Sequence, residues 1–152
     1  MTESVIRTSK IDALEGRDVE VVDIPGAYLS ADMDDEVRMV FRGALAELMV
    51  TTDPAIYRPF VSYETGQAVL YVRLKKVLYG CLKSALLFYE KLVGYLETYG
   101  LRTNPYGPCM ANKMVGRKQL TVCWHMENPN ISCVDTNKMK KLYSGYSQNM
   151  EK

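Results

Sequence analysis

The stretch SALLFYEKLVGYLETY (residues 84–99) and the stretch CMANKMVGRKQLTVCW (residues 109–124) decide the fold class of this chain. In the first, apolar residues recur three and four positions apart along one helical face, namely Leu86, Tyr89, Leu92, Val93 and Leu96. Gly100 follows at a position where glycine commonly ends a helix. In the second, two apolar runs flank residues 115–118, a connection of hairpin length. A long helix next to a β-hairpin predicts an α+β fold with an antiparallel sheet and packed helices.

Further elements are predicted toward the N-terminus. Residues 19–23 are β-branched and acidic and precede Pro25-Gly26, so we expect a buried strand that ends at Asp23. Residues 43–50 predict a short helix that Asp53-Pro54 breaks. The apolar face of that helix is expected to hold Ala44, Leu45, Leu48 and Met49.

Two more elements complete the pattern. Residues 60–63 and 69–74 flank a polar connection that contains Gly66, which predicts a second hairpin. Asp135 is placed to cap a final helix, which Gly145 weakens. The apolar face of this helix would hold Met139, Leu142, Tyr143 and Tyr146.

Length and composition favour a single domain. The chain has 152 residues and 47% hydrophobic content, and its 19 Lys and Arg nearly balance 18 Asp and Glu. A net charge of +1 neither proves nor excludes a nucleic-acid partner. No run approaches the roughly 20 apolar residues of a membrane span, and no signal or transit segment opens the chain, so we expect an intracellular protein without a membrane partner.

The cysteines carry no functional signal. Cys81, Cys109, Cys123 and Cys133 form no C-x-x-C pair, and His125 is the single histidine. This spacing argues against a zinc site and for free thiols in a reducing compartment.

One combination of motifs carries chemistry. Taken alone, Asp23 at the end of an apolar strand is more often a turn or cap residue than a catalyst. In order along the chain, however, come the strings 23–28 (DIPGAY), 78–83 (LYGCLK), 85–92 (ALLFYEKL), 104–109 (NPYGPC), 111–114 (ANKM) and 121–125 (TVCWH). With these separations, residues 11–135 resemble the reverse transcriptase domain of copia-type retrotransposons.

The resemblance implies a partial right-hand polymerase, with fingers and palm, that performs RNA-directed DNA synthesis. It implies two Mg²⁺ ions, a primer-template of RNA and DNA, and a deoxynucleoside triphosphate as partners. Family members work in the cytoplasm or nucleus, in virus-like particles. Clustered carboxylates suit this chemistry because one ion activates the primer hydroxyl while a second neutralises the leaving pyrophosphate.

The resemblance also assigns roles to residues. Asp23 would be the first metal ligand, with the backbone carbonyl of Ile24 completing the site. Tyr28 would be the aromatic gate that excludes a ribose 2′-hydroxyl, and ordinary core packing is the less favoured alternative. Tyr79, Gly80 and Lys83 would contact nucleotide and template, and their alternative role is a loop that precedes the long helix.

The third family motif departs from its pattern. The family has two adjacent Asp residues on a hairpin turn, and Glu127 and Asn128 stand there in this chain. One acid is longer by a methylene and the other is a neutral amide, so the metal ligands Asp23 and Glu127 would bind Mg²⁺ weakly. Pro129 follows, and proline cannot donate to a strand ladder.

Two functional hypotheses follow, besides a weaker one. The string 104–109 has Gly107 where the family has an acid, and no thumb, connection or ribonuclease H region is recognisable, so we expect an impaired fragment whose missing regions a longer polyprotein would supply. The alternative is a non-catalytic remnant that binds nucleic acid or protein through the palm. A metal-dependent hydrolase is disfavoured because His125 is the sole nearby general base in sequence.

Overall fold

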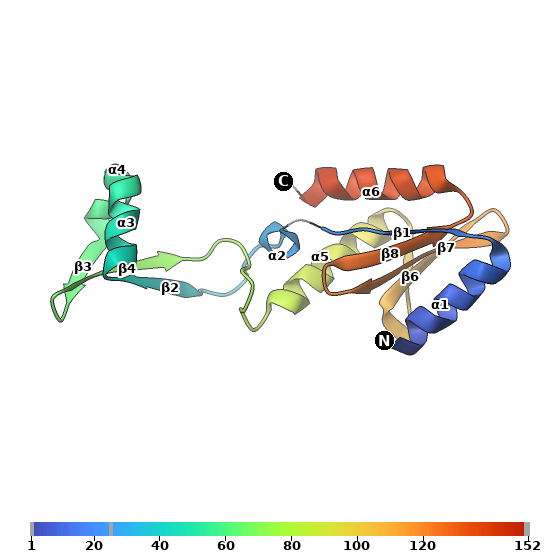
Figure 1. The fold of residues 1–152 in the computed structure, drawn as a ribbon, viewed down its shortest axis with the longest axis horizontal. Helices are drawn as coiled ribbons and strands as arrows, with labels where there is room; N and C mark the ends of the chain where they lie inside the picture. Colours follow the sequence, from blue (N-terminus) through green and yellow to red (C-terminus); the bar gives the residue numbers. More distant parts are fainter. Residues whose placement is uncertain (1, 25, 151–152) are drawn as a thin grey trace. The chain divides into compact units, whose positions relative to one another are not determined.

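The computed structural model describes residues 2–24 and 26–150, which form two compact units (Figure 1). The first unit comprises the chain up to Ala31 and from Val77 onward, and the second comprises Asp32–Lys76. The expected α+β class is confirmed, because both units combine helices with an antiparallel sheet. The single domain expected from composition is divided at residues 31–32 and 76–77.

The first unit is a five-stranded antiparallel sheet between helices. Its elements are α1 (Thr2–Glu15), β1 (Asp18–Val21), α2 (Ala27–Ser30), α5 (Ser84–Thr98), β5 (Arg102–Asn104), β6 (Gly107–Val115), β7 (Lys118–His125), β8 (Asn128–Cys133) and α6 (Thr136–Met150). The strand order is β1-β8-β7-β6-β5, so that β1 and β5 lie at its two edges.

Alternate residues of β7 face opposite sides of this sheet. Trp124 faces α5, where its ring lies 6.1 Å from that of Tyr89, and Val122 lines a small apolar cavity with Leu92 and Leu142 of α5 and α6. Thr121 faces the other side, where α1 lies. The unit therefore has three layers, with α5 and α6 on one face of the sheet and α1 on the other.

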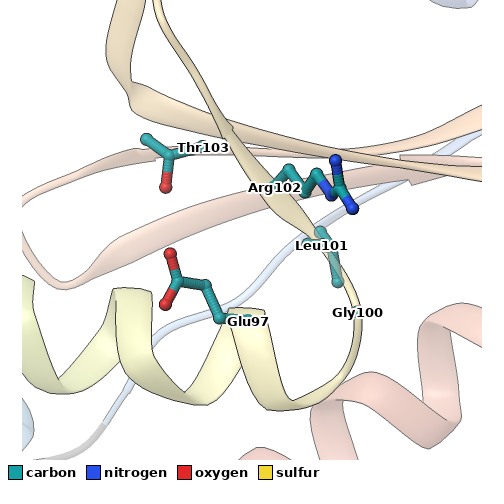
Figure 2. Close-up of a pocket in the computed structure, with 5 residues that line it drawn as sticks. All are labelled: Glu97, Gly100, Leu101, Arg102 and Thr103. Atoms are coloured by element: carbon teal, nitrogen blue, oxygen red, sulfur yellow. The ribbon is translucent and has the colours of Figure 1, made fainter.

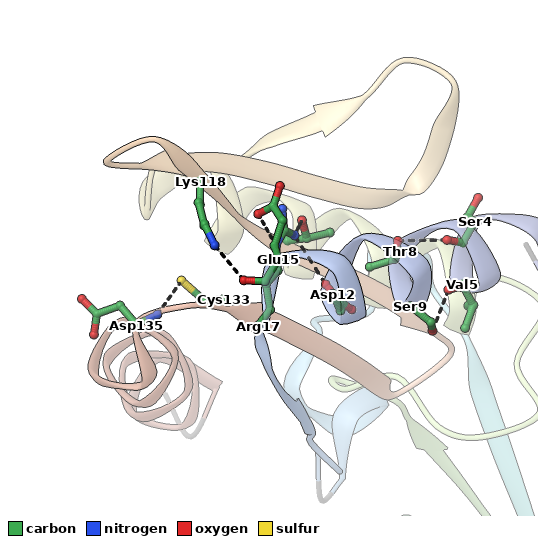
Figure 3. A network of polar contacts seen from close by, with 11 residues as sticks. Ser4, Val5, Thr8, Ser9, Asp12, Glu15, Arg17, Lys118, Cys133 and Asp135 are labelled. Carbon is green, nitrogen blue, oxygen red and sulfur yellow. Dashed lines mark hydrogen bonds and ion pairs between the residues drawn. The ribbon is translucent and has the colours of Figure 1, made fainter.

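Helix α1 is attached to the sheet by polar side chains (Figure 3). Arg17, whose side chain is 2% exposed, donates to Thr121 Oγ1 at 3.0 Å and forms ion pairs with Asp12 at 3.5 Å and Glu15 at 3.1 Å. Lys118 Nζ adds a bond of 2.7 Å to the Glu15 carbonyl. Buried charges persist where each has a partner, and this set satisfies that condition.

The predicted helix over residues 84–99 is confirmed as α5 and the predicted hairpin over residues 109–124 as β6 with β7, but the buried face of α5 is shifted. Its fully buried residues lie four apart: Ser84, Phe88, Leu92 and Leu96. Leu86, expected on the apolar face, is 52% exposed. The shift follows from Phe88, which packs beneath α2 against Tyr28.

Strand β1 differs from the expectation. It ends at Val21 rather than Asp23, and it is an edge strand whose four residues are all exposed rather than a buried strand. Val22 and Ile24, beyond its end, are the buried residues of this segment.

The second unit is a three-stranded sheet covered by a helix. Its elements are β2 (Arg38–Arg42), α3 (Ala44–Thr52), α4 (Pro54–Tyr57), the 3₁₀-helix η1 (Arg58–Phe60), β3 (Val61–Glu64) and β4 (Gln67–Arg73). The strand order is β2-β4-β3, which confirms the hairpin predicted here. The core joins Ala46 of α3 to Ala68 and Leu70 of β4.

The predicted helix over residues 43–50 is confirmed, but of its predicted apolar face only Met49 packs against the core. Leu45 and Leu48 are 58% and 60% exposed, whereas Ala46 is fully buried. Asp53 ends α3 as expected and then caps α4, because its carboxylate accepts the Ile56 N–H at 3.2 Å.

Helix α6 begins as predicted. Asp135 Oδ1 accepts the Asn137 N–H at 3.0 Å, which is the expected cap. Gly145 does not end the helix, and a Cβ at this position would lie 2.7 Å from Tyr95 Oη. Glycine therefore makes room for the Tyr95 hydroxyl, which donates to the Leu142 carbonyl at 2.6 Å. Among the described helices, none has the length and apolar character needed to cross a membrane.

Candidate functional site

Strand pairing brings Asp23 to the β7–β8 turn. Strands β1 and β8 are antiparallel, with Val21 opposite Asn130. A bond of 2.9 Å from the Val22 N–H to the Pro129 carbonyl extends this pairing by one residue. Continued by one more residue, the same register puts Asp23 at the level of Asn128, the first residue after the turn. The Asp23 side chain is exposed there.

The turn itself consists of Met126 and Glu127, between the paired residues His125 and Asn128. Met126 has a positive φ of 53°, as tight hairpin turns often require. Glu127 Oε2 is buried and has no hydrogen-bond partner among the described residues. Burying a carboxylate oxygen without a hydrogen-bond partner costs free energy, so Glu127 Oε2 is a candidate to bind a ligand or a water molecule.

Pro129 does not interrupt β8. It lies opposite Trp124 and accepts the Val22 N–H through its carbonyl. Because proline has no N–H, the pair of Val22 and Pro129 has one backbone hydrogen bond, whereas a pair of two other residues could form two. The weakened pairing coincides with the end of β1 at Val21.

Tyr28 of α2 is buried beside the turn. Its ring meets that of Tyr79 at 4.6 Å and that of Phe88 at 5.5 Å, both edge-on, and the residue is 4% exposed. Burial raises the pKa of Tyr28, and the negative charge of Glu127 and the nearby Tyr79 raise it further. Tyr28 and Glu127 are therefore electrostatic neighbours. The packing itself is that of a core aromatic residue.

A turn at Gly26 leads into α2. Gly26 has a φ of +64°, which favours glycine, and the Ile24 carbonyl accepts the Ala27 N–H at 3.1 Å. The carbonyl that the resemblance assigns to the metal site is thus already engaged once within this turn. Its second lone pair remains for another donor or a cation.

The loop before α5 holds the other candidate residues. Tyr79 is 58% exposed, Gly80 has a φ of +89°, and Lys83 immediately precedes the helix. The loop is organised by Ser84, whose hydroxyl lies 2.7 Å from the carbonyl oxygens of both Leu78 and Cys81. Sequence reasoning missed Ser84, although a serine at the start of a helix is a recognisable signal.

The donor set fits a divalent cation only in part. Asp23 and Glu127 offer carboxylate oxygens at one end of the sheet, and the unpartnered Glu127 Oε2 suits a hard cation. Across the residues that the structure describes, no three His, Cys, Asp or Glu side chains gather closely enough to hold a metal ion. Asn128, at the third position, supplies an exposed neutral amide.

The thiols and the histidine lie outside this donor set. All four cysteines are free, Cys123 and Cys133 are buried, and burial raises the pKa of the Cys123 thiol. His125 is exposed at the end of β7.

A separate open hollow lies at the C-terminal end of α5 (Figure 2). Glu97, Gly100, Leu101, Arg102 and Thr103 line it. Figure 2 shows the Glu97 carboxylate directed toward Thr103, while the Arg102 guanidinium lies on the other side of the strand. The polar groups do not converge, so this hollow does not form a second reaction centre.

Comparison of the chain with protein-family models, with curated proteins and with solved structures gave no match.

Proposed function

We propose that the chain is the fingers and palm part of a copia-type reverse transcriptase, an RNA-directed DNA polymerase whose catalysis is impaired. The observation that carries the proposal is the β1–β8 pairing, which leads Asp23 to the β7–β8 turn where Glu127 keeps a buried oxygen without a partner. Asp23 and Glu127, which are more than 100 residues apart in the sequence, thereby lie toward the same end of one sheet. The family assignment comes from the resemblance of residues 11–135, and the placement of Asp23 and Glu127 toward the same end of the sheet supports it.

In the proposed reaction each residue has a limited task. Asp23 and Glu127 bind Mg²⁺, which when bound would activate the primer hydroxyl and neutralise the leaving group. Tyr28, whose ring contacts that of Tyr79, would exclude a ribose 2′-hydroxyl. Gly80 permits close backbone approach, and Lys83 attracts phosphate oxygens.

The impairment has a simple electrostatic cause. Two carboxylates instead of three lower the negative charge around the ions, and the longer Glu127 places its oxygens less rigidly. We expect Mg²⁺ binding in the millimolar range, which corresponds to about −4 kcal/mol.

A non-catalytic role is the second candidate. It is favoured by the neutral Asn128 and by the core-like packing of Tyr28. In that case the palm surface would bind a nucleic acid or a protein, and no nucleotide would be incorporated.

Calorimetric titration with Mg²⁺ tests the site. We expect weak binding that Asp23→Ala abolishes, and a gain of at least about tenfold in Glu127→Asp combined with Asn128→Asp, since tenfold requires only ~1.4 kcal/mol. A micromolar site in the unaltered chain would refute the impairment. Binding that survives Asp23→Ala would overturn the site itself.

Primer extension on a primed RNA template then separates the two candidate functions. Extension by the doubly substituted chain that is lost when Asp23→Ala is added would establish polymerase chemistry at these residues. Tight Mg²⁺ binding by the same variant without any extension would favour the non-catalytic role.

A further inference from the structure

A cavity of about 390 Å³ lies at the other end of the sheet, beside the β6–β7 turn. Lys113 and Lys138 contribute to its walls, together with Tyr99, Gly116 and apolar side chains that include Met114 and Leu120. The eight residues of β7 separate this turn from the Glu127 turn, a span of roughly 25 Å at the usual rise of a strand. The cavity is therefore distinct from the candidate carboxylate site.

Lys113 is held in a fixed position. Its Nζ donates to the Tyr99 carbonyl at 2.7 Å and lies 5.0 Å from the centre of the Tyr99 ring. A Cβ on Gly100 would lie only 3.2 Å from this Nζ, so the absence of a side chain there lets the ammonium approach. One of three N–H donors is used, and the other two remain for a ligand.

Lys138 comes from a different element, the first turn of α6. Its backbone carbonyl lies 3.4 Å from the Tyr99 hydroxyl, so Tyr99 links both lysine-bearing segments. The nearby acid, Asp135, directs Oδ1 to the Asn137 N–H at the start of α6. Within the described part of the chain, neither Lys113 nor Lys138 forms an ion pair with a carboxylate.

The surrounding sequence is basic although the whole chain is nearly neutral. Residues 105–126 contain Lys113, Arg117 and Lys118 without any acid, and residues 136–150 contain Lys138, Lys140 and Lys141 without any acid. Of these residues, Lys113 and Lys138 line the cavity itself, and none of the described residues that line it is an acid. Such a field attracts anions before contact.

We propose that this cavity binds the phosphate group of a nucleotide, with Lys113 and Lys138 as its two cationic ligands. Two lysines that line one cavity suit a multivalent oxyanion, because charge-assisted bonds to phosphate are the strong ones. The cavity is much larger than one phosphate, and its apolar walls accommodate the organic part of the ligand. A free nucleotide and a nucleotide within a strand share this chemistry.

Binding of adenosine monophosphate and of an oligodeoxythymidylate, each measured by calorimetry at low salt without Mg²⁺, tests the proposal. Lys138→Gln should weaken binding roughly fivefold to tenfold, as expected for the loss of one charge-assisted contact. Lys113→Gln should do the same, and Lys10→Gln, which removes an equal charge from α1, is the matched control and should change nothing. Lys138 is exposed, so we expect Lys138→Gln to fold, and its effect on binding can be measured even if Lys113→Gln unfolds.

The two probes identify the source of the phosphate. Lysine-dependent binding of the monophosphate alone assigns a free nucleotide, and lysine-dependent binding of the oligonucleotide assigns a strand. Binding of neither probe overturns the proposal. An equal loss in Lys10→Gln also overturns it, because a diffuse field would then explain the binding without a site.

Discussion

The polar attachment of α1 makes a sharp stability prediction. In Arg17→Met the aliphatic length is retained, but Asp12, whose side chain is 6% exposed, loses its cation and Thr121 loses a hydrogen bond of 3.0 Å. Removing one partner of a buried ion pair typically costs about 3–5 kcal/mol, because the remaining charge stays buried. A loss of that size lowers the melting temperature of a domain of this length by roughly 10 °C or more.

The same helix contains the control. Arg7 pairs with Glu3, but their side chains are 74% and 77% exposed, so Arg7→Met should cost no more than about 0.5 kcal/mol. Urea unfolding can be followed by the fluorescence of Trp124, which is 3% exposed on the strand that α1 contacts. Adding Asp12→Leu to Arg17→Met should recover much of the loss, since the orphaned charge is removed. A cost below about 1 kcal/mol for Arg17→Met would show that α1 does not dock as described.

Three further changes test other parts of the structure. Glu127→Gln should lower the pKa of Tyr28 while leaving it above its ordinary value, because burial is the larger cause; nuclear magnetic resonance of labelled tyrosine would show an unchanged pKa if the two groups are not neighbours. Gly145→Ala should cost about 1–3 kcal/mol through the clash at 2.7 Å with Tyr95 Oη, and thermal melts should show a smaller loss in a Tyr95→Phe background. Burial raises the pKa of Tyr95 to about 12, so its neutral form is favoured on folding and its contribution to stability should be lost between about pH 10 and 12. Leu48→Gln should change stability by no more than about 0.5 kcal/mol, and a larger loss in denaturant titration would mean that this face of α3 is covered.

Elements with strong apolar periodicity or a clear turn were predictable. Residues 84–99 form α5 within one residue, and the connection at Gly116 forms the β6–β7 turn. Exact faces were less predictable, because packing partners choose among the apolar residues of a helix. In α3, Ala46 is buried where the sheet approaches closely, and the larger Leu45 and Leu48 are left outside.

Helix α1 and strand β8 are among the elements that escaped sequence reasoning, and they did so for opposite reasons. Helix α1 buries Thr8 and Asp12 while Ile6 and Leu14 are exposed, so its pattern is the reverse of an amphipathic helix and depends on Arg17. Strand β8 begins with Asn128-Pro129-Asn130, residues of low strand propensity. Pairing with β7 on one side and β1 on the other overrides that propensity.

The family resemblance assigns Asp23, Tyr28 and Glu127 to one site, and that assignment stays a prediction. The arrangement comes from the structure, in which the β1–β8 register leads Asp23 toward the turn that holds Glu127. The sequence contained no indication that Tyr79 would cover Tyr28, because ring packing depends on a loop whose geometry Ser84 determines.

The two segments that connect the units are bonded to each other, and this has a consequence for engineering of the chain. Asp32 is bridged to Lys76, Met33 donates to the Lys75 carbonyl, and Val77 donates to the Ala31 carbonyl at 3.1 Å. The chain therefore passes from the first unit to residues 32–76 and back at neighbouring positions, Ala31 and Val77, as it does around an inserted module. Because the cost of closing a loop depends only weakly on its length, a short turn could replace all 45 of these residues with little entropic effect on the remaining sheet.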